Sequence, residues 1–205
     1  MAWVMFDYDG VISRWPSDQD MMTIAAAAGI AARRFADAYW PPRPAYDRAE
    51  LDAAGYWQQV GRLAGRGRPY AAAEVAALSR LDTDSWLHLE AGTVALIEEL
   101  AAAGHRLAML SDVPVAIADA IAGLPVARYF EHLIFSCQLN QTKPDPACFA
   151  AALARLGAAA AEVIFVDDRP GNTAAAAAMG LRAVHFSSPG QARAILAELL
   201  SHHSQ

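Results

Sequence analysis

The sequence predicts an α/β protein built on a doubly wound parallel sheet, with a small helical domain inserted into it. Short apolar runs recur along the chain, and parallel strands that are covered on both faces have this composition. Helical segments separate the later runs, so strand and helix alternate as they do in right-handed βαβ units. The predicted strands are Trp3–Phe6, Leu107–Leu110, His132–Phe135, Val163–Val166 and Ala183–Phe186.

The helices predicted between these strands begin and end at residues that suit helix termini. Two of them begin with proline, whose missing N–H is tolerated in the first turn. Three of them precede a glycine, which readily adopts the left-handed conformation that follows a helix. The predicted helices are Gly92–Ala103, Pro114–Ala122, Pro146–Leu156 and Gly171–Met179, and the glycines are Gly104, Gly157 and Gly180.

The segment between the first two predicted strands is too long for a single crossover. About a hundred residues separate Phe6 from Leu107, whereas a βαβ unit needs roughly thirty. The stretch Ser17–Trp86 has a helical pattern broken by prolines, and its aromatic residues suffice for a small core of its own. The predicted domains are a sheet-containing core of residues 1–15 and 87–205 and a helical cap of residues 16–86.

Composition excludes several classes of protein. The chain has 205 residues, of which 55% are hydrophobic and 19% charged, so global disorder is excluded and one domain with a smaller insert is expected. The formal net charge of −6 argues against a nucleic-acid or anionic-membrane partner. The two cysteines provide neither a disulfide framework nor a zinc pattern.

The N-terminus, MAWVMFDYDG, lacks the basic region of a signal peptide, and no run approaches the roughly 20 apolar residues of a membrane span. We therefore expect a cytoplasmic protein without a membrane partner.

Polar side chains follow four of the predicted strands, at the edge of an α/β sheet where ligands bind. They comprise carboxylates, a hydroxyl and an amine, and the parallel arrangement brings all four strand ends to one crevice. They are Asp7 and Asp9 after the first strand, Ser111 and Asp112 after the second, Lys143 after the third, and Asp167, Asp168, Arg169 and Asn172 after the fourth.

These residue types favour a magnesium and phosphate site. Several carboxylates in one crevice repel one another, and burying them unpaired is costly, so a divalent cation is expected among them. Oxygen ligands without histidine or cysteine indicate Mg²⁺ rather than Zn²⁺. Lys143 adds a positive charge, and Ser111 adds a hydroxyl donor for a phosphate oxygen. The spacing of Asp7 and Asp9 lets one side chain attack while the other transfers a proton.

Four motifs at these strand ends resemble the motifs of the haloacid dehalogenase (HAD) superfamily, whose core is a Rossmann-like sheet. They occur in the order and at the spacing of that family, over about 120 residues of the core. The family also places a helical cap between its first two motifs. The matching segments are Phe-Asp-Tyr-Asp-Gly-Val at 6–11, Leu-Ser-Asp at 110–112, Lys-Pro-Asp-Pro at 143–146, and Phe-Val-Asp-Asp-Arg at 165–169 with Asn172 and Gly-Leu at 180–181.

The resemblance implies a role for each matching residue. Asp7 would be the nucleophile that forms an aspartyl-phosphate, and Asp9 would be the general acid and then the base that activates water. Ser111 and Lys143 would hold the phosphoryl oxygens, and Lys143 would also restrain Asp7. The implied Mg²⁺ site consists of Asp7, the backbone carbonyl of Asp9, Asp168, and Asp167 as a ligand or as a neighbour of one.

Other residues are candidates for substrate contact or support. Asp112 stands where asparagine is common in this branch, and its negative charge is expected to influence which substrates bind. Arg14 lies where the chain leaves the core, and it fits a substrate gate and an ordinary linker equally well. Arg169 fits a structural ion pair better than a catalytic role, and Asn172 fits a supporting hydrogen bond. The predicted substrate-binding residues are Ser111, Asp112, Lys143 and Arg14.

The resemblance implies an enzyme, a Mg²⁺-dependent phosphatase that acts on a small phosphorylated metabolite through an aspartyl-phosphate. Within the cap, Asp47–Leu51 followed by Tyr56 and Trp57 resembles the caps of small phosphatases. A sugar phosphomutase with the same intermediate stays open as an alternative. A 2-haloacid dehalogenase is disfavoured because the dehalogenases of the family lack an aspartate at the position of Asp9. A non-catalytic binding module is the fourth alternative, and either a monomer or a homodimer fits the sequence.

Overall fold

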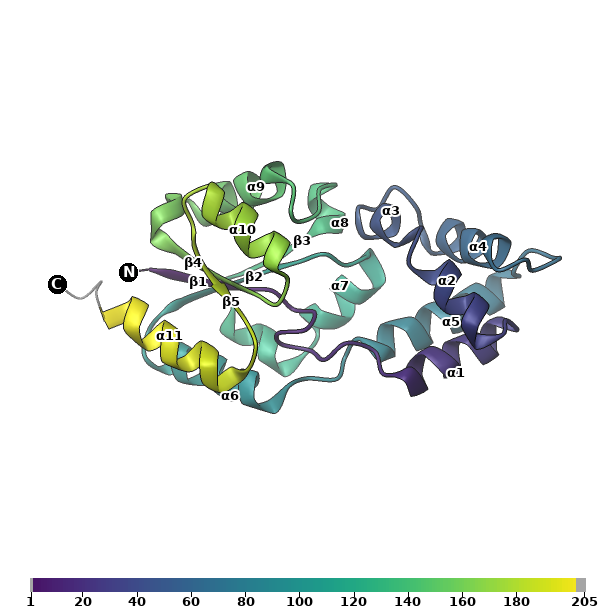
Figure 1. Cartoon of the computed structure of the whole chain (residues 1–205), viewed down its shortest axis with the longest axis horizontal. Coiled ribbons are helices and arrows are strands. Elements are labelled where there is room, and N and C mark those ends of the chain that lie inside the picture. The colour runs from purple at the N-terminus through teal and green to yellow at the C-terminus, as the bar shows by residue number, and fades with distance from the viewer. Residues whose placement is uncertain (1, 202–205) are drawn as a thin grey trace.

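The computed structural model describes residues 2–201. Five parallel strands form one sheet in the order β3-β2-β1-β4-β5, with β1 at its centre (Figure 1). The chain therefore winds from β1 to one side of the sheet and later to the other, as the sequence predicts. The strands are β1 (Trp3–Phe6), β2 (Arg106–Ser111), β3 (His132–Phe135), β4 (Val163–Asp167) and β5 (Arg182–His185).

Helices cover both faces of the sheet. Successive side chains of β1 point to opposite faces and pack against different helices. Val4 and Phe6 belong to a core packed with residues of α6, α7 and α11, whereas Trp3 and Met5 belong to a core packed with residues of α9 and α10. The bounds are α6 (Ala91–Ala102), α7 (Val115–Ala122), α8 (Ser136–Leu139), α9 (Pro146–Leu156), α10 (Pro170–Ala178) and α11 (Pro189–Ser201), with 3₁₀ turns at Pro125–Tyr129 and Ala160–Glu162.

Five helices lie between β1 and α6 and form a second, separate core. This core contains Phe35, Tyr39, Tyr56, Trp57 and Leu78, all buried. Figure 1 shows these helices beyond the end of the sheet toward which β1 runs. They are α1 (Asp18–Ala28), α2 (Ala32–Tyr39), α3 (Arg43–Asp47), α4 (Ala53–Leu63) and α5 (Ala72–Ser85). We use the name cap for them, and the domain division at residues 15 and 86 stays a prediction.

Two site residues lie within strands rather than after them. Ser111 is the last residue of β2 and pairs with Phe135, and Asp167 is the last residue of β4 and pairs with His185. Because their backbones still belong to the sheet, the sheet itself orients both side chains. None of the helices within residues 2–201 combines the length and the apolar character that crossing a membrane requires.

Candidate active site

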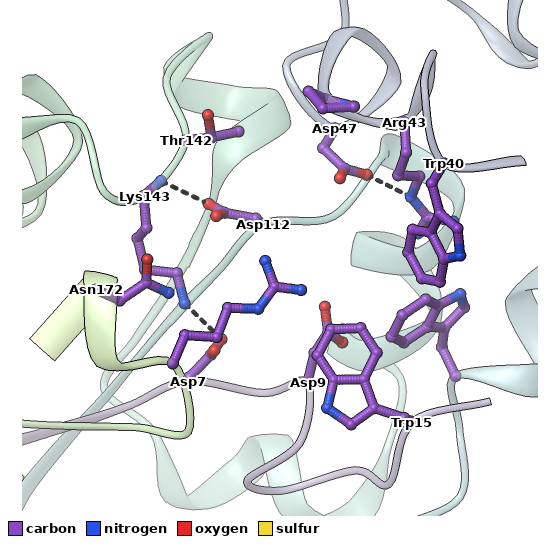
Figure 2. Close-up of a pocket in the computed structure, with 13 residues that line it drawn as sticks. Asp7, Asp9, Trp15, Trp40, Arg43, Asp47, Asp112, Thr142, Lys143 and Asn172 are labelled. Atoms are coloured by element: carbon purple, nitrogen blue, oxygen red, sulfur yellow. Dashed lines mark hydrogen bonds and ion pairs between the residues drawn. The ribbon is translucent and has the colours of Figure 1, made fainter. Parts of the chain in front are cut away.

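A pocket lies where the carboxyl ends of the strands meet the cap (Figure 2). Its volume is about 110 Å³, well below the roughly 300–1,000 Å³ of pockets for drug-sized ligands. Both parts of the chain line it. The core contributes Asp7, Asp9, Trp15, Asp112, Thr142, Lys143, Arg169 and Asn172, and the cap and its end contribute Trp40, Arg43, Pro44, Asp47 and Trp86.

Lys143 links two buried carboxylates on neighbouring strands. Its Nζ lies 2.6 Å from Asp7 Oδ1 and 2.9 Å from Asp167 Oδ2, and its side chain is 1% exposed. Asp7 directly follows β1 and Asp167 ends β4, and these two strands pair with each other. Desolvation favours the neutral amine, but the charges of Asp7 and Asp167 outweigh it and raise the pKa of Lys143. Burial still raises the pKa of Asp7 well above its usual value, and the Lys143 charge opposes that rise. The ammonium is therefore the charge that offsets part of the cost of burying both carboxylates.

The two oxygens of Asp7 differ in their surroundings. Oδ1 accepts a hydrogen bond from the backbone N–H of Tyr8 at 2.7 Å and also faces Lys143 Nζ. Both donors have fixed positions. The Tyr8 N–H belongs to the backbone, and Lys143 Nζ is held between Asp7 and Asp167. They hold the Asp7 side chain in one orientation and leave Oδ2 outside these two contacts.

Asp167 is held from several sides. The amide of Asn172 donates to its two oxygens at 3.1 and 2.9 Å, and the backbone N–H of Arg169 donates to Oδ1 at 2.8 Å. Desolvation raises the pKa of Asp167, but Lys143 and the backbone N–H of Arg169 lower it, and the net shift is downward. The supporting hydrogen bond predicted for Asn172 is confirmed.

Three carboxylates are close enough to hold a cation. One oxygen each of Asp7, Asp167 and Asp168 lies within 4.8 Å of the others. Trp15 Nε1 donates to Asp168 Oδ2 at 3.1 Å, whereas Asp168 Oδ1 is buried without a hydrogen-bond partner among residues 2–201. Burying an unpaired carboxylate oxygen is unfavourable, and a hard cation would compensate it. The donor set therefore fits Mg²⁺.

Ser111 Oγ is also buried without a hydrogen-bond partner in the described part of the chain. The residue at the N-cap of α7 is Pro114, and no side-chain hydrogen bond caps that helix. Ser111 is therefore not a helix cap, and its hydroxyl is free to donate to a bound ligand. Neither Ser111 nor Asp168 lines the open part of the pocket.

Asp9 is suited to proton transfer. Burial raises the pKa of its carboxyl to about 7, although the charge of Arg43 opposes the shift. Its Oδ1 is buried and has no hydrogen-bond partner within the described residues. A carboxyl that titrates near neutral pH can both donate and accept a proton there.

Arg14 and Arg169 lie in different surroundings, and only Arg169 reaches the pocket. Arg14 is exposed and lines another hollow, with Trp15, Ser17, Asp20 and His88, and is not brought to the pocket. The ion pair expected for Arg169 is absent among residues 2–201. Its guanidinium instead lies 4.8 Å from the centroid of the Trp15 ring, and the residue lines the pocket. Asp112 also lines the pocket, and its Oδ1 accepts a hydrogen bond from the backbone N–H of Lys143 at 3.1 Å.

Arg43, a cap residue of the pocket, was not predicted from the sequence. Arg43 is buried, and its Nε donates to Asp47 Oδ1 at 2.8 Å. The available signal was a charged residue between two prolines, Pro42 and Pro44, next to aromatic residues. That pattern indicates a rigid turn but not that the turn faces Asp9.

A family model described as a haloacid dehalogenase-like hydrolase matches residues 1–180. The chain belongs to the HAD-like hydrolases. It is accordingly an enzyme, and the resemblance seen in its four motifs is confirmed.

Curated relatives of this HAD-like hydrolase are phosphatases by name. The phosphoglycolate phosphatase of Rhodospirillum rubrum is 32% identical over 162 residues, which cover 69% of this chain and 67% of that protein. A sesquiterpene phosphatase of Aspergillus oryzae is 26% identical over 187 residues, which cover 89% of this chain and 88% of that protein. A HAD family enzyme from Bacteroides thetaiotaomicron, crystallised with magnesium and inorganic phosphate, shares the fold with a TM-score of 0.75. It is 14% identical, and the match covers 91% of this chain and 94% of that one.

Gly10 provides a test of how closely the loop after β1 packs. Its φ is +76°, and a Cβ there would lie 2.1 Å from Asp168 Oδ2 and 2.6 Å from Trp15 Nε1. We expect Gly10→Ala to break the hydrogen bond from Trp15 Nε1 to Asp168 Oδ2. The control is Gly65→Ala, which has φ +77° but nothing within 4 Å of the added Cβ. In both variants, placing alanine in the left-handed backbone conformation costs about 1–2 kcal/mol.

In urea unfolding, Gly10→Ala should lose about 1 kcal/mol more stability than Gly65→Ala, the value of one hydrogen bond. Equal losses in the two variants would show that Asp168 and Trp15 are not held against this loop.

Proposed function

We propose that this HAD-like hydrolase is a Mg²⁺-dependent phosphatase that hydrolyses a small phosphomonoester through an aspartyl-phosphate on Asp7. The observation that carries the proposal is the pairing of a buried, fixed carboxylate with a carboxyl that titrates near pH 7. Asp7 is held by Lys143 at 2.6 Å, and burial raises the pKa of Asp9 to about 7. The phosphatase names of two curated relatives support the same chemistry.

In the first step, Asp7 Oδ2 attacks the phosphorus atom while its Oδ1 stays bound to Lys143 and to the Tyr8 N–H. The Asp7 oxygen–phosphorus bond forms, and the bond from phosphorus to the leaving oxygen breaks. Asp9, in its protonated form, gives its proton to that leaving oxygen, and the alcohol departs. Lys143 and the Ser111 hydroxyl are in our proposal the donors to the phosphoryl oxygens.

In the second step, Asp9 is ionised and acts as a base. It takes a proton from a water molecule, and the water oxygen attacks the phosphorus. The bond between phosphorus and Asp7 breaks, and inorganic phosphate is released with both carboxyls restored. One residue thus serves as acid and then as base, which requires a pKa close to the working pH.

Asp7, Asp168 and the backbone carbonyl of Asp9 are the proposed Mg²⁺ ligands. Asp167 is the proposed neighbour of this set, since Lys143, Asn172 and the Arg169 backbone already occupy its oxygens. When bound, the metal supplies positive charge that stabilises the transferring phosphoryl group. Two findings support this assignment: Asp168 Oδ1 has no hydrogen-bond partner within residues 2–201, and the Bacteroides fold relative was crystallised with magnesium.

The small pocket beneath the cap supports a small substrate. A folded phosphoprotein does not fit a cavity of about 110 Å³, and a closed cap keeps bulk water from the phosphoenzyme. We accordingly propose a phosphorylated metabolite as the substrate. We also propose the cytoplasm as the location of the enzyme. An L-2-haloacid dehalogenase shares the fold with a TM-score of 0.67 at 23% identity, but the carboxyl of Asp9 favours phosphate chemistry.

Replacing the nucleophile tests the covalent step. Asp7→Asn should abolish phosphate release from every phosphomonoester tested, because the amide has nearly the same shape but is a far poorer nucleophile. Asp52→Asn is a matched control, since Asp52 only caps α4 and asparagine caps equally well. Phosphate release is measured with magnesium present, and circular dichroism checks the fold. An Asp7→Asn variant that keeps a tenth of the wild-type rate would remove Asp7 from this role.

The metal is tested by chelation and by direct binding. Excess chelator should stop phosphate release, and Mg²⁺ should restore it better than Ca²⁺, which is larger and takes more ligands. In calorimetric titrations, Asp168→Ala should weaken Mg²⁺ binding more than Ser111→Ala does, because only the former removes a proposed ligand. Undiminished activity in excess chelator would contradict the metal assignment.

A further inference from the structure

Trp15 lies between the proposed metal site and the cap. Its Nε1 donates to Asp168 Oδ2 at 3.1 Å, and its ring packs edge-on against Trp86 and Trp40, with centroids 5.3 and 6.2 Å away. The Arg169 guanidinium lies 4.8 Å from the centroid of the same ring. Figure 2 shows Trp15 and Trp40 together on the side of Asp9. The indole is therefore held on several sides, and its N–H is a donor of fixed position.

The hydrogen bond from Trp15 distinguishes the two oxygens of Asp168. Oδ2 accepts from the indole, whereas Oδ1 is buried and has no hydrogen-bond partner among residues 2–201. One oxygen of Asp168 lies within 4.8 Å of an oxygen of Asp7 and an oxygen of Asp167. A carboxylate held in this way offers one oxygen to a cation while its other oxygen is already occupied.

The loop after β1 is packed closely around this hydrogen bond. A Cβ on Gly10 would lie 2.1 Å from Asp168 Oδ2 and 2.6 Å from Trp15 Nε1. Asp168 directly follows Asp167, whose backbone still pairs within the sheet. The sheet thus sets where the Asp168 backbone lies, and Trp15 sets how its carboxylate is turned.

The orientation of a carboxylate ligand influences which divalent cation binds. Mg²⁺ requires nearly octahedral coordination at short distances, whereas Ca²⁺ takes more ligands and accepts a carboxylate through one oxygen or both. Binding through both oxygens of Asp168 would have to displace the indole N–H from Oδ2. A carboxylate with one occupied oxygen therefore suits Mg²⁺ better than Ca²⁺. Losing the hydrogen-bond partner of a metal ligand typically weakens metal affinity by about 10–100-fold.

We propose that Trp15 is a positioning residue that gives the site a preference for Mg²⁺ over Ca²⁺, because its indole N–H holds Asp168 with one oxygen free for the metal. The proposal rests on the Mg²⁺-dependent phosphatase function proposed above and assigns a determinant of its metal selectivity. Trp15 acts through Asp168 and is neither a metal ligand nor a catalytic residue.

Metal titrations of Trp15→Phe test the role of the indole N–H. Phenylalanine keeps an aromatic ring in this place and removes the donor. Affinities for Mg²⁺ and for Ca²⁺ are measured separately by calorimetry, on protein freed of metal by a chelator and without any ester. We expect the Mg²⁺ affinity to fall about tenfold and the Ca²⁺ affinity to change much less.

Trp57→Phe is the matched control for this substitution. Trp57 Nε1 donates to Ser79 Oγ at 3.0 Å within the core of the cap. This variant therefore also loses an indole hydrogen bond, but one that does not involve a proposed metal ligand. Its ratio of Mg²⁺ to Ca²⁺ affinity should equal that of the wild type, and circular dichroism checks the fold of both variants.

Two further measurements keep the test independent of one variant and of packing effects. Gly10→Ala displaces the same hydrogen bond by another route and should lower the ratio of Mg²⁺ to Ca²⁺ affinity as well, while Gly65→Ala should leave it unchanged. In phosphate-release assays, Trp15→Phe should need more Mg²⁺ for half-maximal activity, and saturating Mg²⁺ should restore most of kcat. A loss of general packing would not be restored by the metal.

Unchanged Mg²⁺ affinity in both Trp15→Phe and Gly10→Ala, or equal weakening of Mg²⁺ and Ca²⁺ binding, would overturn the proposal. A wild-type protein without a preference for Mg²⁺ would overturn it as well. The titrations do not depend on turnover. A selective loss of Mg²⁺ binding without phosphate release from any ester would contradict the phosphatase function alone. Mg²⁺-dependent phosphate release with an unchanged metal preference in both variants would contradict the role of Trp15 alone.

Discussion

The buried ammonium of Lys143 is the interaction on which the rest of the site depends. Its two partners, Asp7 and Asp167, belong to the ends of the paired strands β1 and β4. Without a cation between them, two carboxylates could not both stay ionised in a buried place. Removing one partner from a buried ion pair typically costs about 3–5 kcal/mol, so the contact constrains the fold as well as the chemistry. Asp112 fixes the lysine in turn by binding its backbone N–H.

The position of the cap follows from contacts at two separate points. At the far end of α3, the Ser136 hydroxyl donates to the Asp47 carbonyl at 2.6 Å, and the Asn140 amide donates to the Arg48 carbonyl at 2.9 Å. Where the chain returns to the core, the Trp86 carbonyl accepts from Tyr8 Oη and Ser13 Oγ. Because hydrogen bonds anchor the cap at these two points, Arg43 and Asp47 are held where they line the pocket with Asp9.

The sheet and the catalytic end of the site could be predicted because they follow from local patterns. Apolar runs mark the strands, and parallel strands bring their carboxyl ends together, so Asp7 and Lys143 meet although they are far apart in sequence. The cap side of the pocket could not be predicted in this way. Arg43, Trp40 and Trp86 reach it through the packing of helices against one another, which leaves no short-range signal. Arg169 was misjudged for the same reason, since its aromatic partner, Trp15, lies on a different loop.

The central claim is that Asp7 carries the phosphoryl group. It is tested most directly by mass spectrometry of the Asp9→Asn variant after acid quenching, following incubation with magnesium and p-nitrophenyl phosphate, whose leaving group departs without a proton from Asp9. In that variant the base of the second step is missing, so we expect one phosphoryl group per chain, located on Asp7. An unmodified Asp7, or a phosphoryl group on another residue, at an ester concentration where the wild type releases phosphate, would contradict it.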